Sequence, residues 1–281
     1  MGSYLRPREL SDALEALSSG RRVVLAGGTD YYPARVGLPL DDDILDITDL
    51  GALKGIRDEG KHWRIGALMT WTQILEAKLP PLFDGLKQAA REVGGVQIQN
   101  TGTICGNLCN ASPAADGIPN LLALDATVEL ASLSGSRFLS VADFVRANRK
   151  TARATNEMMT AILVPKPARA ARSIFLKLGA RRYLVISIVM VGAVIESEPD
   201  GTIAGARIAV GACSPVARRL PELERALVGK RLAPQLATLA IPAHLAPLSP
   251  IDDVRGTSVY RRDATLTLLR RAIASLAGDR A

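Results

Sequence analysis

Two adjacent glycines directly after a short apolar segment constrain this chain more than any other feature. Residues 22–26 predict a strand, which leads into Gly27, Gly28, Thr29 and Asp30. Paired glycines tolerate positive φ and let the backbone approach a ligand closely. Consecutive amide N–H groups can then form a concave site for phosphate oxygens. Because the GxGxxG dinucleotide fingerprint is absent, the turn indicates either another kind of anion site or a plain tight turn.

A second glycine-containing segment follows about 75 residues later, at residues 101–107. It lies within residues 93–113, which are rich in Gly, Asn and Ser, show no helical period and predict a ligand-binding loop. Asp116 could accept a hydrogen bond from a ribose or ribityl hydroxyl, and short polar side chains could donate others: Thr103, Asn107 and Ser112. The two glycine loops either enclose one elongated diphosphate from both sides or are unrelated surface turns.

The chain has 281 residues, of which 48% are hydrophobic and 22% are charged, which predicts an ordinary globular protein of two domains. Only eleven residues are aromatic, so the core must consist mainly of Val, Ile, Leu and Ala. Cys105, Cys109 and Cys213 are too few for a disulfide framework or for an iron–sulfur cluster that needs four thiolates. With His62 and His244 as the only imidazoles, no metal site is expected.

No segment predicts a membrane span. The longest apolar stretch, residues 183–195, has thirteen residues, whereas a spanning helix needs roughly 20, and its Val and Ile content favours a buried strand. The N-terminal sequence lacks the apolar core of a secretory signal, and Arg21 and Arg22 precede a strand instead of a signal core. Together with the sparse cysteines, these features predict a cytoplasmic protein.

Basic residues are concentrated between residues 146 and 182 of a chain whose formal net charge is +7. This stretch holds ten Lys and Arg residues and a single acid, Glu157. It is interpreted either as a solvated basic surface or as a docking face for an acidic protein or an anionic cofactor. Nucleic acid is not an expected partner, because no recognition motif and no interleaved aromatic residues accompany the charge.

The periodicity of apolar residues predicts an α+β chain. Strands are expected at residues 22–26, 44–47, 63–66, 127–130, 159–164, 173–178, 187–196 and 207–212. Helices are expected at residues 10–17, 70–77 with Thr70 as N-cap, 80–92, 221–228 and 264–276, and a hairpin turn at 198–201. The Pro165-Lys166-Pro167 segment predicts a boundary between domains at residues 1–168 and 169–281. The first domain would have subdomains of about 1–53, a β-α-β-loop-β unit, and 54–168.

Four ordered matches resemble one family over almost the whole chain. The pair AGGTD and TGTICGNLCNASPAAD is similar to the FAD-binding medium subunit of the molybdenum hydroxylases, which include carbon monoxide dehydrogenase and xanthine dehydrogenase. Also similar are FLKLGARR…ISIVMVGAVI, GACSPVARRLPELERAL and IDDVRGTSVYRRDATLTLLRRAI. The resemblance implies an FAD-binding domain of the vanillyl-alcohol-oxidase (PCMH) type, with two subdomains that hold FAD between them, followed by a C-terminal α+β domain.

The resemblance also implies which residues contact FAD. The first loop binds the diphosphate in the family and comprises Ala26, Gly27, Gly28, Thr29, Asp30 and Tyr31. The second, usually Thr-x-Gly-Gly-Asn, reads Thr103, Ile104, Cys105, Gly106 and Asn107 here. Further expected contacts are Ser112, Asp116, Met159 on the adenine side and Lys177 near the isoalloxazine ring, where a cation would stabilise the reduced flavin. Neither histidine lies in a matching motif, so FAD is expected to be non-covalent.

Cys105 departs from the family pattern, because it stands in place of a glycine. If that position required positive φ, the cysteine would strain the loop by about 1–2 kcal/mol. Otherwise the position has an allowed conformation and tolerates a small side chain. A redox-active thiol beside the flavin is the third interpretation. Residues 179–184 correspond to a mobile loop over the flavin in some members of the family.

By this resemblance, the chain is expected to be the FAD-carrying electron-transfer subunit of a molybdenum hydroxylase, without catalytic residues for the primary substrate. The expected partners are a large molybdopterin-binding subunit and a small subunit with two [2Fe-2S] clusters, in a dimer of heterotrimers. Electrons would pass from the clusters through FAD to a final acceptor. A free-standing FAD-dependent reductase of the same general fold is the alternative, and a scaffold that has lost FAD is a third interpretation.

Overall fold

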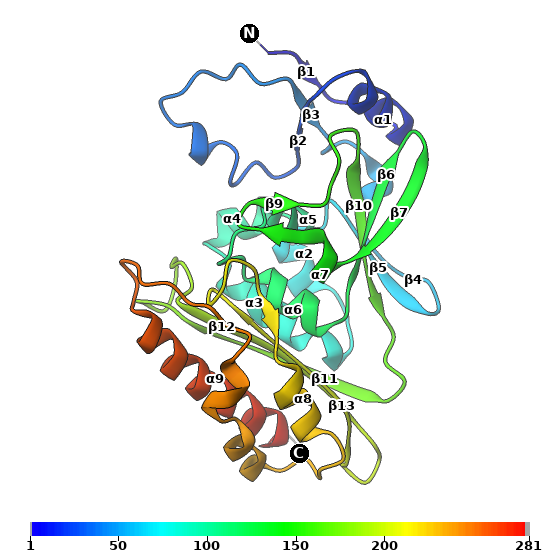
Figure 1. Cartoon of the computed structure of the whole chain (residues 1–281). Coiled ribbons are helices and arrows are strands. Elements are labelled where there is room, and N and C mark those ends of the chain that lie inside the picture. The colour runs from blue at the N-terminus through cyan, green and yellow to red at the C-terminus, as the bar shows by residue number, and fades with distance from the viewer. Residues whose placement is uncertain (1, 279–281) are drawn as a thin grey trace.

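The computed structural model describes residues 2–278 and shows three main sheets that follow one another along the chain. Figure 1 shows a small N-terminal sheet at the top, a five-stranded sheet with helices in the middle, and a four-stranded sheet with a long helix at the bottom. Helices and strands are mixed throughout, so the α+β class expected from the sequence is confirmed.

The N-terminal segment is the predicted β-α-β-loop-β unit. Its three strands are parallel and short, in the order β1 (Tyr4–Leu5), β3 (Ile44–Asp46) and β2 (Val23–Leu25). Helix α1 (Leu10–Ser19) connects β1 to β2, and the loop from β2 to β3 contains the 3-10 helix η1 (Pro33–Arg35). Strands this short bury few side chains, and those of this unit belong to the same core cluster as the next sheet.

The five-stranded sheet is antiparallel, and its strands come from the beginning and the end of the middle segment, residues 54–168. Its order is β4 (Ile56–Asp58), β5 (His62–Gly66), β10 (Met158–Pro165), β6 (Thr127–Ser132) and β7 (Gly135–Ser140). The elements around it are η2 (Gly51–Leu53), α2 (Trp71–Glu76), η3 (Pro81–Phe83), α3 (Asp84–Glu92), α6 (Gly117–Ala123), α7 (Val141–Phe144) and the hairpin of β8 (Val145–Ala147) and β9 (Lys150–Thr151).

Helix α2 begins where the sequence predicts. The Thr70 hydroxyl accepts a hydrogen bond from the Gln73 amide at 3.3 Å, and the Gln73 side chain accepts one from the Thr70 amide at 3.0 Å. This reciprocal pair is a capping box, which satisfies two amides that the first helical turn leaves free. The N-cap prediction is therefore confirmed.

The prediction of a non-helical loop at residues 93–113 is wrong. The segment contains two short helices, α4 (Val96–Thr101) and α5 (Ile104–Asn110). Thr103 caps α5, because its hydroxyl accepts a hydrogen bond from the Gly106 amide at 2.9 Å. Helices of six or seven residues complete fewer than two turns, which is too few for an apolar period to stand out among Gly, Asn and Gln.

The C-terminal segment forms an antiparallel sheet in the order β11 (Ala170–Leu178), β12 (Val189–Ser197), β13 (Ile203–Gly211) and β14 (Arg218–Arg219). The predicted hairpin turn between β12 and β13 is confirmed, and Gly201 adopts a φ of +86° there. The helical elements are α8 (Pro221–Leu227), η4 (Pro234–Leu239), η5 (Pro242–Leu245) and α9 (Ser258–Gly278). Helix α9 begins six residues before the predicted 264.

Both faces of this C-terminal sheet are covered, which explains the almost continuous apolar sequence of β12. Helices α3 and α6 pack on one face and α9 on the other. Gly192 allows the close approach of α6, because a Cβ atom there would lie 2.9 Å from the Pro119 carbonyl oxygen. The prediction of a buried strand within residues 183–195 is confirmed for residues 189–195, whereas residues 183–186 are irregular and mostly exposed.

Candidate functional site

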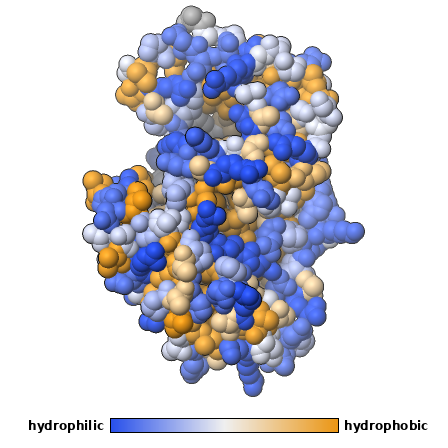
Figure 2. All heavy atoms as spheres, viewed as in Figure 1, coloured by the Kyte–Doolittle hydropathy of each residue, from blue (hydrophilic) through white to orange (hydrophobic). Residues whose placement is uncertain are grey.

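A cavity of about 650 Å³ lies between the N-terminal sheet and the five-stranded sheet. Its walls come from β2 and the following glycine turn, from α5, from the β8–β9 hairpin and from β10. Figure 2 shows the surface hollowed between the N-terminal segment and the rest of the molecule, with hydrophilic residues along the lower margin. Cofactor sites commonly have volumes of about 300–1,000 Å³, so this cavity is large enough for an elongated ligand.

The two glycines of the first loop have different structural roles. A Cβ atom on Gly27 would lie 2.0 Å from the Thr101 carbonyl oxygen, so only glycine allows the two loops to meet backbone to backbone. Gly28 adopts a φ of +67°, and a Cβ atom there would lie 2.7 Å from the Tyr32 ring. The structure therefore brings together the two loops that the sequence predicts to form one site.

The backbone amides of the first loop face no acceptor of the protein. Within residues 2–278, no hydrogen bond from the amides of residues 27–31 to another group is found, although four of these five residues are partly buried. Backbone amides normally pair with a protein group or with water, so these donors are open to a bound ligand. Several adjacent free amides beside a cavity form a site for an anion with multiple oxygens, such as a diphosphate.

Arginine side chains add positive charge to the cavity walls. The single carboxylate in the lining is that of Asp30, whereas five arginines take part: Arg21, Arg22, Arg35, Arg149 and Arg153. The Arg35 guanidinium stacks on the Tyr31 ring at 3.8 Å and donates to Asp42 at 2.7 Å, which fixes its position. A surplus of cations in a partly enclosed space attracts an anionic ligand.

The structure distributes the basic stretch of residues 146–182 among different places, and its interpretation as a docking face for an acidic protein stays a prediction. Arg149 and Arg153 line the cavity, and their side chains donate to Asn110 Oδ1 at 2.7 Å and to the Glu157 carbonyl at 2.6 Å. Arg146 instead lines a separate groove beside α6 and α7, and Lys177 is buried in an ion pair. Of these residues, only Arg149 and Arg153 have a geometry that favours contact with an anionic cofactor.

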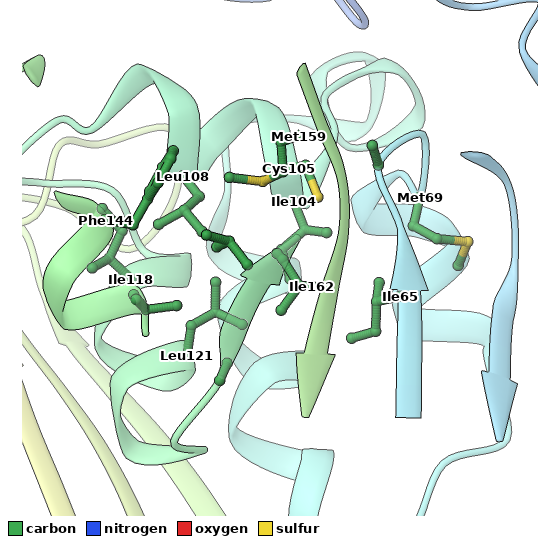
Figure 3. Packing of buried hydrophobic residues seen from close by; sticks show 14 of the residues in the cluster. Ile65, Met69, Ile104, Cys105, Leu108, Ile118, Leu121, Phe144, Met159 and Ile162 are labelled. Atoms are coloured by element: carbon green, nitrogen blue, oxygen red, sulfur yellow. The ribbon is translucent and has the colours of Figure 1, made fainter. Parts of the chain in front are cut away.

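Cys105 lies inside α5 in an ordinary helical conformation and is not among the residues with positive φ. The second of its three interpretations, an allowed conformation, is therefore confirmed. Figure 3 shows its side chain beside Met159 of β10, within the buried cluster. Burial raises the pKa of the Cys105 thiol well above its usual range and the pKa of Cys109 to about 11. Thiols that stay protonated at neutral pH are weak nucleophiles, which argues against a redox role.

Eleven of the fifteen predicted site residues line the cavity: Ala26, Gly27, Gly28, Thr29, Asp30, Tyr31, Thr103, Cys105, Gly106, Asn107 and Met159. Four do not. Ile104 is fully buried in the core, and Ser112 stabilises a turn by accepting the Ala114 amide at 3.3 Å. Asp116 and Lys177 contact each other behind the cavity wall. The prediction missed the five lining arginines, and the basic stretch was a signal for only two of them, Arg149 and Arg153.

The Asp116–Lys177 ion pair is buried at the junction of β11 and α6. The Lys177 ammonium lies 2.6 Å from Asp116 Oδ2, and both side chains are only 6% exposed. The Ser187 hydroxyl donates to Asp116 Oδ1 at 2.6 Å. Burial raises the pKa of the Asp116 carboxyl, and the nearby Lys177 ammonium opposes this shift.

Two further features bear on function. Among the described residues, no group of three or more His, Cys, Asp and Glu side chains is arranged to hold a metal ion. No helix in residues 2–278 is long and apolar enough to cross a bilayer.

Two family models match consecutive parts of the chain. One is described as an FAD binding domain in molybdopterin dehydrogenase and matches residues 1–167. The other is described as the CO dehydrogenase flavoprotein C-terminal domain and matches residues 174–276. The chain is 29% identical to the nicotinate dehydrogenase FAD-subunit of Eubacterium barkeri, covering 95% of this chain and 93% of that protein. It is 30% identical to the glyceraldehyde dehydrogenase medium chain of Sulfolobus acidocaldarius, covering 98% of each.

Solved structures are similar over the same extent. A chain of reconstituted CO dehydrogenase from Oligotropha carboxidovorans superposes with a TM-score of 0.89 at 28% identity, covering 100% of this chain and 99% of that one. A chain of quinoline 2-oxidoreductase from Pseudomonas putida 86 gives a TM-score of 0.88 at 25% identity, covering 99% and 97%. The overall fold is therefore shared with these chains.

Proposed function

Because the chain belongs to the FAD-binding medium subunits of the molybdenum hydroxylases, we propose that it carries electrons between a reduced partner subunit and a final acceptor. FAD supplies one- and two-electron chemistry when bound. The residues of this chain bind and orient the cofactor, and the protein takes no direct part in oxidising the primary substrate.

The donors and the charge of the cavity lining support FAD as the ligand. The free amides of residues 27–31 and the guanidinium groups of Arg149 and Arg153 offer donors and positive charge for the diphosphate. The proposed binding residues are the eleven predicted residues in the lining together with these arginines. Asp116 and Lys177 are proposed to act at the isoalloxazine end of the cavity, and Ser112 and Ile104 to support the second loop.

The proposed domain boundary lies at Pro165-Lys166-Pro167. Residues 1–168 would form the FAD-binding domain, with subdomains of about 1–53 and 54–168, and residues 169–281 the C-terminal domain. The end of β10 at Pro165 and the start of β11 at Ala170 support this boundary. The cavity lies between the two proposed subdomains.

The proposed partners are a large molybdopterin-binding subunit and a small subunit with two [2Fe-2S] clusters, in a dimer of heterotrimers. Support comes from the names of the relatives, several of which are medium chains or FAD-subunits. The three cysteines of this chain are fewer than the four thiolates that one cluster needs. All three are free thiols, which favours a reducing compartment, and we therefore place the complex in the cytoplasm. The match of residues 174–276 favours this subunit over a free-standing reductase.

The free amides of the first loop are the observation that carries the proposal, and a comparison of two flavins tests it. The flavin-depleted chain is expected to bind FAD at least about tenfold more tightly than riboflavin, because only FAD places a diphosphate on these amides. Isothermal titration of both ligands gives the two dissociation constants. Equal affinities would contradict a diphosphate site. Acid precipitation should leave the flavin in the supernatant, and flavin that stays in the pellet would contradict non-covalent binding.

A further inference from the structure

Arg261 of helix α9 is a buried cation with a specific set of partners. Its side chain is 3% exposed, and Nη1 donates to the carbonyl oxygens of Ile188 at 2.7 Å and Ala212 at 2.9 Å. Nη2 lies 2.7 Å from Asp253 Oδ1. Burial of a guanidinium group is costly unless each of its donors is satisfied, yet Nε has no partner among the described residues. Packing of α9 alone would be served by an apolar residue at this position.

Ile188 is the last residue of a connecting segment that has several exposed side chains. Residues 179–188 connect β11 to β12, and Tyr183, Leu184 and Ile186 are each more than half exposed. Leu184 also adopts a φ of +51°. The Ile188 amide donates to the Leu178 carbonyl at 2.7 Å. Arg261 therefore holds the residue at which this irregular segment re-enters the sheet.

The residue before Ile188 reaches the buried ion pair. The Ser187 hydroxyl donates to Asp116 Oδ1, and Asp116 Oδ2 holds the Lys177 ammonium, each at 2.6 Å. Lys177 also donates to the carbonyl of Glu92 at 3.3 Å, and the next residue, Val93, lines the cavity.

A second contact leads from the ion pair to the cavity. The amide of Gly117, next to Asp116, donates to Asn107 Oδ1 at 3.3 Å, and Asn107 is a lining residue. The ion pair is thus fixed to two parts of the cavity wall, the end of α3 and helix α5.

We propose that Arg261 is a positioning residue for the flavin site: it fixes Ile188 and Ser187, and through Ser187 it sets the positions of Asp116 and Lys177 behind the cavity wall. The inference rests on the proposed binding of FAD in this cavity. It gives the C-terminal domain a role at the cofactor, although residues 170–278 contribute no side chain to the cavity lining. Without Arg261, the Ser187 hydroxyl leaves Asp116, and the ammonium of Lys177 no longer has a fixed distance from the cofactor.

The neighbouring Arg262 provides a matched control. It lies on the exposed side of α9, and its guanidinium also donates to two carbonyl oxygens, those of Leu245 and Leu248. Arg261→Met and Arg262→Met remove the same charge from the same helix. Arg261→Lys keeps the charge and can reach one carbonyl, so it should rescue part of the loss.

Two measurements on the full chain test the proposal. In the flavin-depleted chain, Arg261→Met should accelerate amide hydrogen exchange at Ile188 about tenfold or more, whereas Arg262→Met should leave it unchanged. In the FAD-loaded chain, Arg261→Met should shift the flavin midpoint potential and Arg262→Met should not. Equal effects of the two variants in either measurement would overturn the proposal. Failure of the wild-type chain to bind FAD would instead contradict the proposed function, and the exchange measurement would still decide whether Arg261 fixes Ile188.

A double-mutant cycle separates positioning from a general loss of stability. Ser187→Ala removes only the hydroxyl that contacts Asp116. If Arg261 acts through Ser187, Arg261→Met on the Ser187→Ala background adds no further shift of the midpoint potential. Additive shifts would overturn the proposal, as would an Arg261→Met variant with a lowered unfolding midpoint and an unchanged flavin potential.

Discussion

The N-terminal unit and the C-terminal domain lie at opposite ends of the molecule (Figure 1) and are stabilised in different ways. The strands of the first have two or three residues, and its buried side chains join the core of the middle segment. The three long strands of the second have nine residues each, and its sheet and helices share a core cluster of their own. The comparison indicates that the C-terminal domain is held by its own core, whereas the N-terminal unit depends on its neighbours.

The cavity borders the N-terminal unit, which is the region that lacks a core of its own. One of its walls is the first loop of the N-terminal unit, so a ligand that contacts both walls adds its binding free energy to the closed arrangement. The C-terminal domain contacts the cavity only indirectly, through Lys177 and its partners. Changes at the cofactor should therefore affect residues 2–53 strongly and residues 170–278 weakly.

The largest effect is expected from Gly28→Val. A β-branched residue at a φ of +67° is strained, and its Cβ atom would meet the Tyr32 ring in the loop proposed to bind the diphosphate. Flavin content should fall at least about tenfold while the fold is retained. Gly37→Val is the control, because Gly37 has a φ of +78° with no atom near its Cβ position. The flavin-to-protein ratio and circular dichroism measure both, and normal flavin content in Gly28→Val would remove this loop from the site.

Removal of FAD tests the comparison directly. Exchange of backbone amides in residues 31–46 should become about tenfold faster or more, because the N-terminal unit loses the ligand proposed to join it to the middle segment. Amides of β12 and β13 should not change, because both strands are buried in the C-terminal sheet. Hydrogen exchange followed by mass spectrometry measures the two regions in one sample. A uniform acceleration along the chain would mean that the two ends do not differ in their dependence on the cofactor.

Lys177→Ala tests how far the C-terminal domain reaches the cofactor. If Lys177 acts at the isoalloxazine ring as proposed, loss of its cation should lower the flavin reduction potential while FAD is retained. The variant should also be destabilised by about 3–5 kcal/mol, because it leaves a buried carboxylate without its partner. Asp116→Asn combined with Lys177→Met separates the two effects, since it should restore stability without restoring the potential. An unchanged potential in Lys177→Ala would place this residue away from the ring.

The cavity arginines should have a moderate effect that depends on salt. Replacing Arg149 and Arg153 by Gln should weaken FAD binding about tenfold at low ionic strength, and the difference from wild type should shrink at 1 M salt, where the Debye length is about 3 Å. Arg146→Gln is the control from the same basic stretch, since Arg146 lines a different groove. Titrations of FAD at two salt concentrations measure the dissociation constant of each variant. Equal losses in Arg146→Gln would mean that the position of Arg149 and Arg153 in the cavity lining is not what supports FAD binding.

The smallest effect is expected from alkaline pH on the N-terminal unit. A hydrogen bond from Tyr4 to the Asp46 carboxylate raises the pKa of the tyrosine to about 12. A raised pKa stabilises the folded state fully below pH 10 and loses that contribution as the pH rises through 12. Tyr4→Phe should therefore unfold with a weaker dependence on pH between 10 and 12. Identical pH profiles would show that this bond does not stabilise the unit.

Local patterns along the sequence were sufficient for much of the fold. The glycine pair after a strand, the Thr70 N-cap and the hairpin at residues 198–201 depend on neighbours within a few residues, so their structural expectations were confirmed. The two helices within residues 93–113 were missed because each is shorter than two turns. The likeness to one family depends on the order of four sequence segments, so it could be found without a structure.

Only the tertiary structure decided which of these residues meet. Gly27 needs the absence of a side chain because Thr101, distant in sequence, passes against it. The basic stretch separates into cavity arginines, a groove residue and a buried lysine because Arg146 lies on β8, Arg149 and Arg153 lie on either side of β9, and Lys177 lies on β11. The contact between Arg261 and the Ile188 carbonyl depends on packing α9 against β12. Sequence determines local conformation through short-range sterics and hydrogen bonds, whereas these contacts form only when the sheets pack against one another.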